Sequence, residues 1–520
     1  MRGLEIYKDL SNLSGAGVSV ESYDVIVIGG GLLGCFAARN LTRYHLKVAL
    51  LEKREDLCTG ISRANTAIIY SGCDTKPGTL KTSMCVRAAQ GFPQLCDELG
   101  VRYSPCGSIM VSFGERGAEI LRKKLKQGIE NGVSGIKLLT REEVLELEPN
   151  IDGAVNSGLY VPDTGTVMPW ELGLAAAENA VSNGADILLN TEVTGIERIP
   201  NSPQGFKIYT NKGTFFARYI INCAGMAADK VFGMLSAPSV RIVPTAGDYY
   251  ILDTKTAGCI RHVIFHEPEE KGKGLTLVPT VDGNILVGPT ERPGDDFRTE
   301  QAGLDELREL VRQVIPKLPM EHVIRSFGAV RPTPQWNSEF GIRNSKSSDS
   351  FKKSKVRDDD SISDFCILES CGGAVVNFVG VKTPGLTCAN ELGMYASDKA
   401  ADFLGAAVNT DYDPHRPPPV RLSDMSYEER ESFLDGKAPL NSKIVCRCRG
   451  VSEREIVDAI QRFPGATTLD GVKRRTGAGS GRCQGGFCGQ RVIEILAREL
   501  RCTPEEITKD GEGSYFFVKK

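Results

Sequence analysis

The sequence predicts an α/β protein in which two domains are interleaved along the chain and a small helical domain follows them. Three observations predict this arrangement. A buried strand, a glycine turn and a helix lie just after residue 22, alternating strands dominate residues 240–335, and two pairs of cysteines occur near the C-terminus. A length of 520 residues exceeds one ordinary domain, so two or three domains are expected.

Composition and charge narrow the class of protein. The chain is 41% hydrophobic and 25% charged, which is typical of a soluble globular protein. A net charge of −3 does not indicate nucleic-acid binding. No apolar run reaches the roughly 18 residues of a transmembrane segment. Residues 1–21 form a polar leader that resembles neither a secretory signal nor a transit peptide. A cytoplasmic location is expected, with a peripheral membrane contact left open.

The first βαβ unit begins at a continuous apolar run. Tyr23 to Gly29 (Y-D-V-I-V-I-G) predicts a buried parallel strand, and Leu32 to Tyr44 has helical periodicity. Lys47 to Glu52 predicts a second buried strand that ends in an acid. This order of elements is typical of a Rossmann-type dinucleotide-binding domain.

Three glycines and one acid of this unit match the dinucleotide fingerprint. Gly29 permits the tight turn, Gly31 lets the backbone approach a pyrophosphate at the helix N-terminus, and Gly34 allows close helix packing. Glu52 follows at the end of the second strand, where it can bind ribose hydroxyls. Because NAD and FAD sites share this fingerprint, it leaves the choice between them open.

The remaining elements alternate between the two predicted domains. Those assigned to the first domain are a helix at 169–183 and strands near 186–199 and 206–223. Those assigned to the second are the strand Ser108 to Phe113, helices at 115–131, 141–148 and 301–314, and the strands Arg241 to Leu252 and Leu275 to Val287. The second domain is therefore expected to be α+β and mostly antiparallel.

Two segments have the composition of connections rather than of packed elements. Residues 344–363 are rich in serine and charge, which predicts a disordered surface insertion. A Pro-rich stretch from Asp413 to Val420 lies within residues 411–440 and predicts a stiff linker.

Two further glycine turns follow predicted strands. Ile221 to Gly225 (I-N-C-A-G) is a strand that leads into an Ala-Gly turn. Gly380 to Thr387 (G-V-K-T-P-G-L-T) opens a helix and can aim backbone amides at a second part of a cofactor. Taken alone, each turn equally fits an ordinary loop.

Together with the fingerprint, these turns resemble the D-amino-acid oxidase superfamily of FAD-dependent oxidoreductases across residues 22–410. Further matching stretches are S-R-A-N-T-A-I-I-Y-S-G at 62–72, K-P-G-T-L-K at 76–81, P-D-T-G-T-V at 162–167, G-D-Y-Y-I-L at 247–252, V-P-T-V-D-G-N-I-L-V-G-P-T at 278–290 and G-A-V-R-P at 328–332. The resemblance implies FAD as the cofactor. It also implies a substrate that lies over the isoalloxazine ring, between a Rossmann-type FAD-binding domain and a mostly antiparallel substrate domain.

The division of the chain and its cofactor contacts follow from the same resemblance. It implies that residues 22–100, 151–238 and 364–410 form the FAD-binding domain, and that residues 101–150 and 239–343 form the substrate domain. The residues expected to contact FAD are Gly29, Gly31, Gly34, Glu52, Ser62, Asn65, Thr66, Val193, Ala224, Gly225, Gly380, Gly385, Leu386 and Thr387.

Four residues are candidates for binding or oxidising an anionic substrate. Arg331 matches the superfamily arginine that contacts substrate anions, and Lys382 stands where glycerol-3-phosphate dehydrogenases have G-G-K, which favours a phosphate. The alternatives are a structural ion pair for Arg331 and a contact with flavin or solvent alone for Lys382. Tyr70 stands where many relatives have histidine, and an ordinary tyrosine pKa near 10 makes it a poor base. His266 is a candidate base for which packing is the simpler role.

Four C-terminal cysteines are the candidate metal ligands. Cys446 and Cys448 form a C-x-C pair, Cys483 and Cys488 form a C-x4-C pair, and thirty-four residues separate the pairs. This spacing can hold an iron–sulfur cluster, while zinc and disulfides are alternatives.

The segment from C-R-C-R-G-V-S to G-R-C-Q-G-G-F-C-G resembles the BFD-like 2Fe-2S domain appended to bacterial anaerobic glycerol-3-phosphate dehydrogenases. The resemblance implies a 2Fe-2S cluster in a domain at 441–500, followed by a tail at 501–520. Helices are expected between the cysteine pairs, at Glu453 to Arg462 and Thr468 to Arg475. The basic residues around the cysteine loops are expected to face an acidic redox partner or water; they are Arg447, Arg449, Lys473, Arg474 and Arg475.

The combined resemblances imply an FAD-dependent dehydrogenase, most similar to the anaerobic type of glycerol-3-phosphate dehydrogenase. Such an enzyme oxidises sn-glycerol 3-phosphate to dihydroxyacetone phosphate and passes electrons through its 2Fe-2S cluster to an acceptor protein or a quinone. The K-P-G-T-L-K stretch also resembles L-2-hydroxyglutarate-type enzymes, so an L-2-hydroxy acid is the alternative substrate. An amino-acid dehydrogenase and an electron-transfer subunit without substrate turnover are further alternatives.

Overall fold

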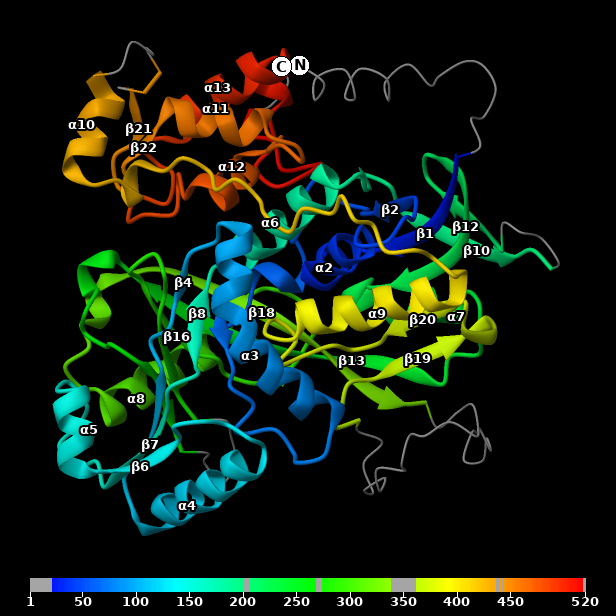
Figure 1. Cartoon of the computed structure of the whole chain (residues 1–520). Helices are drawn as coiled ribbons and strands as arrows, with labels where there is room; N and C mark the ends of the chain where they lie inside the picture. The colour runs from blue at the N-terminus through cyan, green and yellow to red at the C-terminus, as the bar shows by residue number, and fades with distance from the viewer. Residues whose placement is uncertain are drawn as a thin grey trace.

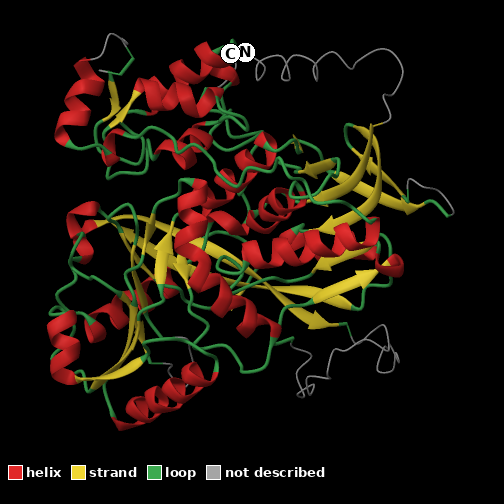
Figure 2. Cartoon of the chain, viewed as in Figure 1, coloured by secondary structure: helices red, strands yellow, loops and turns green. Residues whose placement is uncertain are grey.

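The computed structural model describes residues 21–200, 205–267, 274–337, 362–435, 440–441 and 443–517. Two large sheets with helices around them form the body of the molecule, and the C-terminal helices form a further layer beside it (Figure 1, Figure 2). The predicted α/β class with a small C-terminal helical domain is confirmed.

The first sheet has the parallel core of a Rossmann-type domain. Its parallel strands lie in the order β20 (Val375–Phe378), β12 (Gly213–Asn222), β1 (Glu21–Ile28), β2 (Val48–Leu51) and β9 (Asp186–Leu188). Antiparallel strands complete the sheet: β10 (Val193–Arg198) and β11 (Phe206–Thr210) extend from β12, and β19 (Ile367–Ser370) pairs with β20. The apolar run that predicted β1 is buried along Val25, Ile26 and Val27, as a strand covered on both faces requires.

Helices of the first domain meet in a tight layer. They are α2 (Leu32–Leu41), α3 (Leu80–Leu99), α6 (Pro169–Ser182) and α9 (Ala389–Leu404). Helix α2 packs against both α6 and α9, and these three helices share a core with β1 and β2. A Cβ atom on Gly393 of α9 would lie 2.8 Å from the carbonyl carbon of Phe36, so the backbones of α2 and α9 are in direct contact.

The second sheet has nine strands and is mostly antiparallel, as predicted. In spatial order the strands are β17 (Arg292–Pro293), β13 (Val240–Leu252), β16 (Ile285–Val287), β15 (Thr276–Pro279), β14 (Val263–His266), β5 (Ser108–Ser112), β7 (Ser157–Val161) and β6 (Lys137–Thr140), with β18 (Val323–Trp336) paired to β13. Strand β7 pairs with β5 and β6, which places residues 157–161 in this sheet rather than in the FAD-binding segment 151–238. Pairing on both edges satisfies the backbone of β7 there.

The two faces of the second sheet have different roles. On one face pack the helices α5 (Arg141–Leu147) and α8 (Gln301–Val314), where Leu307 and Val311 are buried. Helix α4 (Glu115–Glu130) covers the sheet near β5 and β7. The opposite face carries Tyr249 and Ala329 and packs on Ile68 of the first domain. The space between the two domains therefore lies against this face.

A small sheet and the C-terminal domain complete the structure. The small sheet joins the domains and consists of β3 (Ile68–Ile69), β8 (Gly165–Val167) and β4 (Tyr103–Ser104). The C-terminal domain contains the hairpin β21 (Ile444–Cys446) and β22 (Val451–Ser452), and helices α11 (Glu453–Gln461), α12 (Leu469–Thr476) and α13 (Gly489–Leu500). Ser452 and Glu455 form a capping box that begins α11, so the predicted helices between the cysteine pairs are confirmed.

The Pro-rich segment after α9 is bound to the body of the protein. Asn179 of α6 donates to the carbonyl oxygens of Asp413 and His415, at 3.0 and 3.1 Å. The buried side chain of Arg416 bonds Glu178 of α6 at 2.7 Å. The chain then continues through α10 (Tyr427–Asp435) toward the C-terminal domain (Figure 1).

The predicted insertion at 344–363 lies outside the described residues except for its last two positions, and so does the leader 1–21 except for Glu21. Among the described helices, none is both long enough and apolar enough to cross a membrane.

Replacement of Arg416 by alanine is expected to destabilise the protein by about 3 kcal/mol, because it leaves the buried carboxylate of Glu178 with one fewer partner. Urea unfolding followed by the fluorescence of Trp170 on α6 measures the change. Arg122→Ala, which removes an exposed ion pair with Glu115, is the matched control and should leave the transition unchanged. Equal shifts in both variants would contradict a role for the Arg416 pair.

Candidate functional site

The turn between β1 and α2 is shaped by close backbone contacts. Gly29 has φ of +105°, and a Cβ atom there would lie 2.5 Å from the carbonyl oxygen of Cys223. A Cβ on Gly34 would lie 1.9 Å from the carbonyl oxygen of Gly29. Only glycine fits at these two positions, because helix α2 lies directly on the turn.

Gly31 differs from the other two glycines because the space in front of it is open. A Cβ there would meet only the Ser62 hydroxyl oxygen, at 3.3 Å. The same hydroxyl accepts a hydrogen bond from the backbone N–H of Leu32, at 2.9 Å. Gly31 is the N-cap of α2 and has no capping side chain, so free N–H groups and the positive end of the helix dipole face this space. The arrangement fits a pyrophosphate.

Glu52 lies beside this turn at the end of β2. One carboxylate oxygen accepts from the N–H of Gly30 at 2.6 Å, and the other accepts from the N–H of Arg54 at 2.8 Å. Burial raises the pKa of Glu52, while these two hydrogen bonds act in the opposite direction. The side chain is thereby held where a ribose of a bound dinucleotide would lie.

The second glycine turn meets the first. Ala224 follows β12, and its Cα would lie 2.9 Å from a Cβ on Gly29. Gly225, the next residue, has φ of +59°. Val193 begins β10 at the same end of the sheet as the Glu52 loop, where Thr191 donates its N–H to the Glu52 carbonyl at 2.8 Å. These contacts bring residues from both halves of the first domain to the same end of the first sheet.

The third glycine turn reaches the second sheet. A Cβ on Gly380 would lie 2.7 Å from Pro334 and 2.9 Å from the carbonyl oxygen of Pro332, so the turn lies on β18. Thr387 accepts a hydrogen bond from the N–H of Tyr70 at 2.9 Å. Leu386 and Gly385 lie between these two contacts, at the start of α9. The turn therefore links the first domain to the strand that carries Arg331.

The segment 61–67 lies between these turns. Asn65 accepts from the N–H of Ala67 at 2.8 Å and donates to the carbonyl oxygen of Ser62 at 3.0 Å. The hydroxyl of Thr66 lies 3.4 Å from that of Tyr70. Hydrogen bonds thus order this segment, and its Ser62 lies at the space that opens in front of Gly31.

Arg331 lies on β18 next to an aromatic group of residues. Its Nη1 is buried and has no hydrogen-bond partner among the residues that the structure describes, while Nη2 donates to the Thr290 carbonyl at 3.5 Å. The Tyr249 hydroxyl lies near the guanidinium: burial raises the pKa of Tyr249, and Arg331 acts against that rise. A buried cation with an unused donor is suited to a ligand anion.

Tyr70 lies close to Arg331 but is a weak acid in this environment. Burial raises its pKa to about 12, although hydrogen bonding to Thr66 and the charge of Arg331 lower it. The hydroxyl is therefore protonated at neutral pH and can donate a hydrogen bond, but it cannot act as a base there. Its ring stacks on Phe265, with centroids 6.2 Å apart.

Lys382 and His266 have different positions relative to this group. Lys382 is half-buried in the turn that Gly380 holds on β18, beside the strand position of Arg331. His266 is adjacent to Phe265 on β14, so its side chain points to the opposite face of the strand. There it packs against Phe113, with ring centroids 5.7 Å apart. The structure brings Arg331 and Tyr70 to one region, places Lys382 in the turn that packs on the same strand as Arg331, and leaves His266 outside this region.

Two aromatic residues of the site were not among the predicted residues. Tyr249 and Phe327 stack with ring centroids 4.7 Å apart and an interplanar angle of 2°, on neighbouring strands β13 and β18. Tyr249 lies in the stretch G-D-Y-Y-I-L that carried the resemblance, which is the signal that marks it. Phe327 has no such signal, because only strand pairing places it beside Tyr249.

The four predicted metal ligands lie together in two pairs. Cys448 and Cys483 have sulfur atoms 3.7 Å apart, and Cys446 bonds Cys488. Cys446 and Cys488 are buried in the domain core, whereas Cys448 is exposed. In the described part of the chain, no three metal-binding side chains converge on one point. Two pairs of thiolates are the ligand set of a cluster with two irons.

Backbone amides surround two of these sulfurs. The hydrogen bond from Cys488 lowers the pKa of Cys446 to about 6, with smaller effects from the N–H groups of Gly479 and Arg449, while burial acts against them. The N–H of Phe487 is the main cause of a lowered pKa at Cys483. Such amides stabilise thiolates and the sulfur atoms of a bound cluster.

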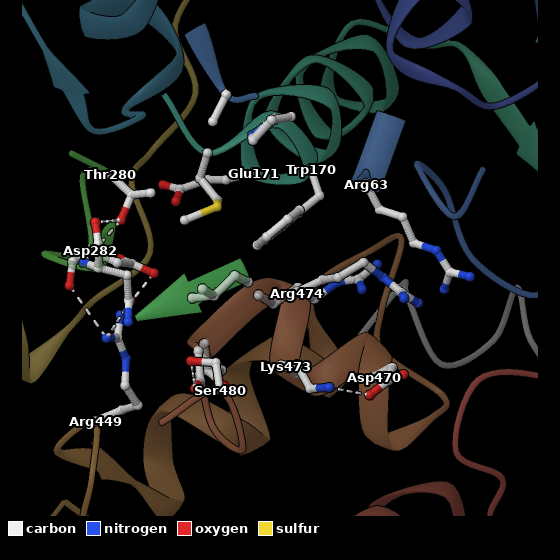
Figure 3. A pocket seen from close by; sticks show the side chains of 18 of the residues that line it. Arg63, Trp170, Glu171, Thr280, Asp282, Arg449, Asp470, Lys473, Arg474 and Ser480 are labelled. Carbon is white, nitrogen blue, oxygen red and sulfur yellow. Dashed lines mark hydrogen bonds and ion pairs between the residues drawn. The ribbon is translucent and has the colours of Figure 1, made fainter. Parts of the chain in front are cut away.

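A cavity of about 740 Å³ lies between the body and the C-terminal domain (Figure 3). Asn65 and Phe327 line its wall on the side of the body, and Cys448 and Lys473 line the facing wall. Trp170 extends from α6 into this space (Figure 3). The exposed Cys448 therefore faces the loop expected to contact the flavin.

Comparison with known proteins agrees with this geometry. The FAD dependent oxidoreductase family matches residues 24–399, and the BFD-like 2Fe-2S binding domain matches residues 444–498. The chain belongs to the FAD-dependent oxidoreductase family. The oxidoreductase binds FAD in its body and a 2Fe-2S cluster in its C-terminal domain. The open space at Gly31, the free amides of α2 and the paired cysteines fit these two groups.

The oxidoreductase is similar to several characterised proteins. It is 38% identical over 501 residues to the glycerol 3-phosphate dehydrogenase of Caloramator mitchellensis, covering 95% of this chain and 98% of that one. It is 31% identical over 285 residues to the mitochondrial L-2-hydroxyglutarate dehydrogenase of Homo sapiens, covering 52% of this chain and 61% of that one. Its structure matches the L-α-glycerophosphate oxidase of Mycoplasma pneumoniae with FAD bound, with a TM-score of 0.67, 26% identity and coverage of 77% and 100%.

Gly34→Ala is expected to abolish FAD binding and to destabilise the first domain by about 3 kcal/mol, because the new methyl group collides with the Gly29 carbonyl. Flavin absorbance per protein and the thermal transition measure both effects. Gly60→Ala is the matched control, since a Cβ there meets no atom within 4 Å. Normal flavin content in the Gly34 variant would show that α2 does not need this contact.

Cys446→Ala is expected to remove the cluster and to leave FAD in place, because the two cofactors are held by separate domains. Iron content and the visible absorbance of the cluster are the measurements, together with the ratio of flavin to protein. Cys502→Ala changes a half-buried cysteine of the adjoining tail, which packs on the core of the same domain outside the four ligands, and should retain iron. Full iron content in the Cys446 variant would exclude this cysteine as a ligand.

Proposed function

We propose that this oxidoreductase oxidises sn-glycerol 3-phosphate to dihydroxyacetone phosphate. The unused buried donor of Arg331 is the observation that carries the proposal, because it offers a guanidinium to an anion next to the expected flavin position. The relative from Caloramator mitchellensis, which is named a glycerol 3-phosphate dehydrogenase, aligns over nearly the whole chain and supports the choice of substrate.

Arg331 and Lys382 provide the charge for a phosphate dianion. Arg331 lies on β18, and Lys382 lies in the turn that packs on the same strand at Pro332. A phosphate carries about two negative charges at neutral pH, so two cations suit it better than one. Because both side chains belong to rigid elements, they would hold the phosphate while the carbinol carbon lies toward the flavin.

The chemistry divides between the cofactor and the protein. FAD supplies the acceptor for the hydride that leaves the carbinol carbon. Tyr70 remains protonated and is placed to donate a hydrogen bond to the substrate oxygen, so the hydroxyl proton leaves to water or to another group. The aromatic residues Tyr249, Phe327 and Phe265 line this space and limit the access of water.

The position of the exposed cysteine pair supports a second part of the proposal, in which electrons leave the protein through the 2Fe-2S cluster. Cys448 and Asn65 line the same cavity, from the cluster loop and from the expected flavin loop. A cluster supplies one-electron transfer, which a reaction with oxygen at the flavin does not need. The external acceptor is proposed to be a redox protein or a quinone.

Anaerobic titration of the purified protein tests the substrate. Glycerol 3-phosphate is expected to bleach the flavin absorbance and then to change the cluster bands. L-2-hydroxyglutarate is the second compound to be tested, because the human relative is named an L-2-hydroxyglutarate dehydrogenase and matches about half of this chain. Bleaching by L-2-hydroxyglutarate alone would replace the proposed substrate, bleaching by an amine alone would indicate an amino-acid dehydrogenase, and no bleaching by any of these compounds would reject a dehydrogenase function.

Arg331→Met is expected to raise the glycerol 3-phosphate concentration for half-maximal flavin reduction about 100-fold, because charge-assisted hydrogen bonds to the phosphate are lost. Flavin content should not change. Arg241→Met, an exposed arginine on the neighbouring strand β13, is the matched control and should behave as the wild type.

Tyr70→Phe tests the role of the protonated tyrosine in the same assay. A loss of less than about tenfold in the rate of flavin reduction is expected, because one neutral hydrogen bond is removed. The pH profile should match that of the wild type between pH 6 and 9, because a pKa of about 12 keeps Tyr70 protonated over that range. A pH step that disappears in the variant would instead identify Tyr70 as a base.

A further inference from the structure

Several ion pairs between the C-terminal domain and the body join arginines of that domain to carboxylates of the body. Arg449 binds Asp282 of the body at 2.8 Å, Arg462 binds Glu178 at 3.0 Å, and Arg482 lies 3.6 Å from Asp253. The arginines near the cysteine loops were expected to face a redox partner or water. Arg449, Arg474 and Arg475 bind carboxylates of the body instead, and Lys473 binds Asp470 of its own helix, so that expectation is wrong for these four.

Asp56 is the central carboxylate of this surface. Its side chain is 1% exposed, and the side chains of Arg474 and Arg475 are each 6% exposed. Arg474 donates to Asp56 at 2.7 and 3.1 Å, and Arg475 donates at 2.8 and 2.9 Å. Despite its burial, the two arginines hold the pKa of Asp56 at about 2. Four charge-assisted hydrogen bonds converge on one carboxylate, which is a strong and geometrically specific arrangement.

A second carboxylate extends the network to the expected flavin loop. Asp510, in the C-terminal tail, accepts from Arg474 at 3.0 Å and also bonds Arg63. Arg63 directly follows Ser62, which accepts from the first turn of α2. The tail thus closes the contact between the cluster domain and the body.

The Asp56 loop is itself part of the dinucleotide-binding turn. Cys58, two residues after Asp56, donates its N–H to the Gly30 carbonyl at 2.9 Å. Leu57 packs so closely on the turn that a Cβ atom added to Gly30 would lie 2.4 Å from the Leu57 side chain. Glu52, at the start of the same loop, bonds the N–H of Gly30. The C-terminal domain is therefore anchored on the loop that holds the glycine turn.

These anchors determine which side of the C-terminal domain faces the body. Arg449 follows Cys448 directly and bonds Asp282 (Figure 3). This bond holds the exposed cysteine on the cavity wall. Arg474, from α12, lies across the same cavity, where Figure 3 shows it below Trp170. Two separate points of attachment leave the domain little freedom to rotate.

We propose that Asp56 is a positioning residue for electron transfer, whose bonds to Arg474 and Arg475 keep the cluster domain docked with its exposed cysteine pair toward the flavin loop. The proposal rests on the exit of electrons through the cluster. The two-electron-reduced flavin loses one electron at a time, the oxidised cluster gains it, and a quinone or a redox protein then reoxidises the cluster. Transfer takes place within a fixed arrangement and needs no swinging motion of the C-terminal domain.

Asp56→Asn in the full-length protein with both cofactors tests the proposal. Flash photoreduction of the flavin, which needs no substrate, starts electron transfer, and absorbance follows flavin reoxidation and cluster reduction. A decrease of about tenfold or more in the transfer rate is expected, because the observed rate scales with the fraction of docked molecules. Small-angle X-ray scattering of the same sample should show a larger radius of gyration, which reports undocking independently of activity.

Asp458→Asn is the matched control, because the ion pair of Asp458 among the described residues is with Arg454 of the same helix α11, at 3.0 Å. It should transfer electrons at the wild-type rate and scatter as the wild type does. Arg475→Gln removes the arginine side of the same contact and should reproduce the Asp56 effect if Asp56→Asn fails to fold. An unchanged transfer rate in both Asp56→Asn and Arg475→Gln, with flavin and iron contents retained, would overturn the proposal.

The outcomes also separate this proposal from the proposed substrate. In one outcome, glycerol 3-phosphate fails to reduce the flavin while photoreduced flavin still reduces the cluster in an Asp56-dependent way. That result would support the positioning role of Asp56 and reject the proposed substrate. If photoreduced flavin never reduces the cluster in the wild type, the exit through the cluster fails, and the positioning role of Asp56 fails with it.

Discussion

The contact between helix α2 and the turn after β1 is the constraint on which the rest of the molecule depends. Gly34 lies against the Gly29 carbonyl with no room for a side chain, which fixes the helix axis on the end of the sheet. Helices α6 and α9 then pack on α2, and Gly393 allows α9 to approach its backbone. The loop after β2 closes over the same turn through Glu52 and Cys58. One close approach thus orients both the cofactor cradle and the surface that carries Asp56.

Arginine has two distinct roles in this structure, and its partners separate them. At the interface between body and C-terminal domain, buried arginines are matched by carboxylates, so their charges are neutralised and the contact is specific. At the proposed substrate face, Arg331 donates a long bond to a carbonyl oxygen, and its buried Nη1 has no partner in the described chain. A saturated arginine holds structure together, whereas an unsaturated one is free to bind a ligand anion.

The cavity between the body and the C-terminal domain results from the way in which that domain is docked. The docked domain touches the body at Asp56 on one side and at Asp282 on the other, and the space between remains open. Because Cys448 and Asn65 lie on its opposing walls, the same docking that encloses the cavity also brings the cluster loop toward the loop expected to contact the flavin.

The sequence by itself determined the features that depend on contiguous residues: the βαβ unit with its glycines and Glu52, the cysteine spacing, the helices between the cysteines and the alternating strands of the second sheet. Each of these follows from local periodicity, turn chemistry or ligand spacing. Only the tertiary structure decided which distant side chains meet. It paired Tyr249 with Phe327 across β13 and β18, turned His266 away because neighbours on a strand face opposite sides, and moved β7 into the second sheet. It also joined Asp56 to Arg475 across 419 positions, a pairing that no local pattern encodes because each charge alone equally suits water.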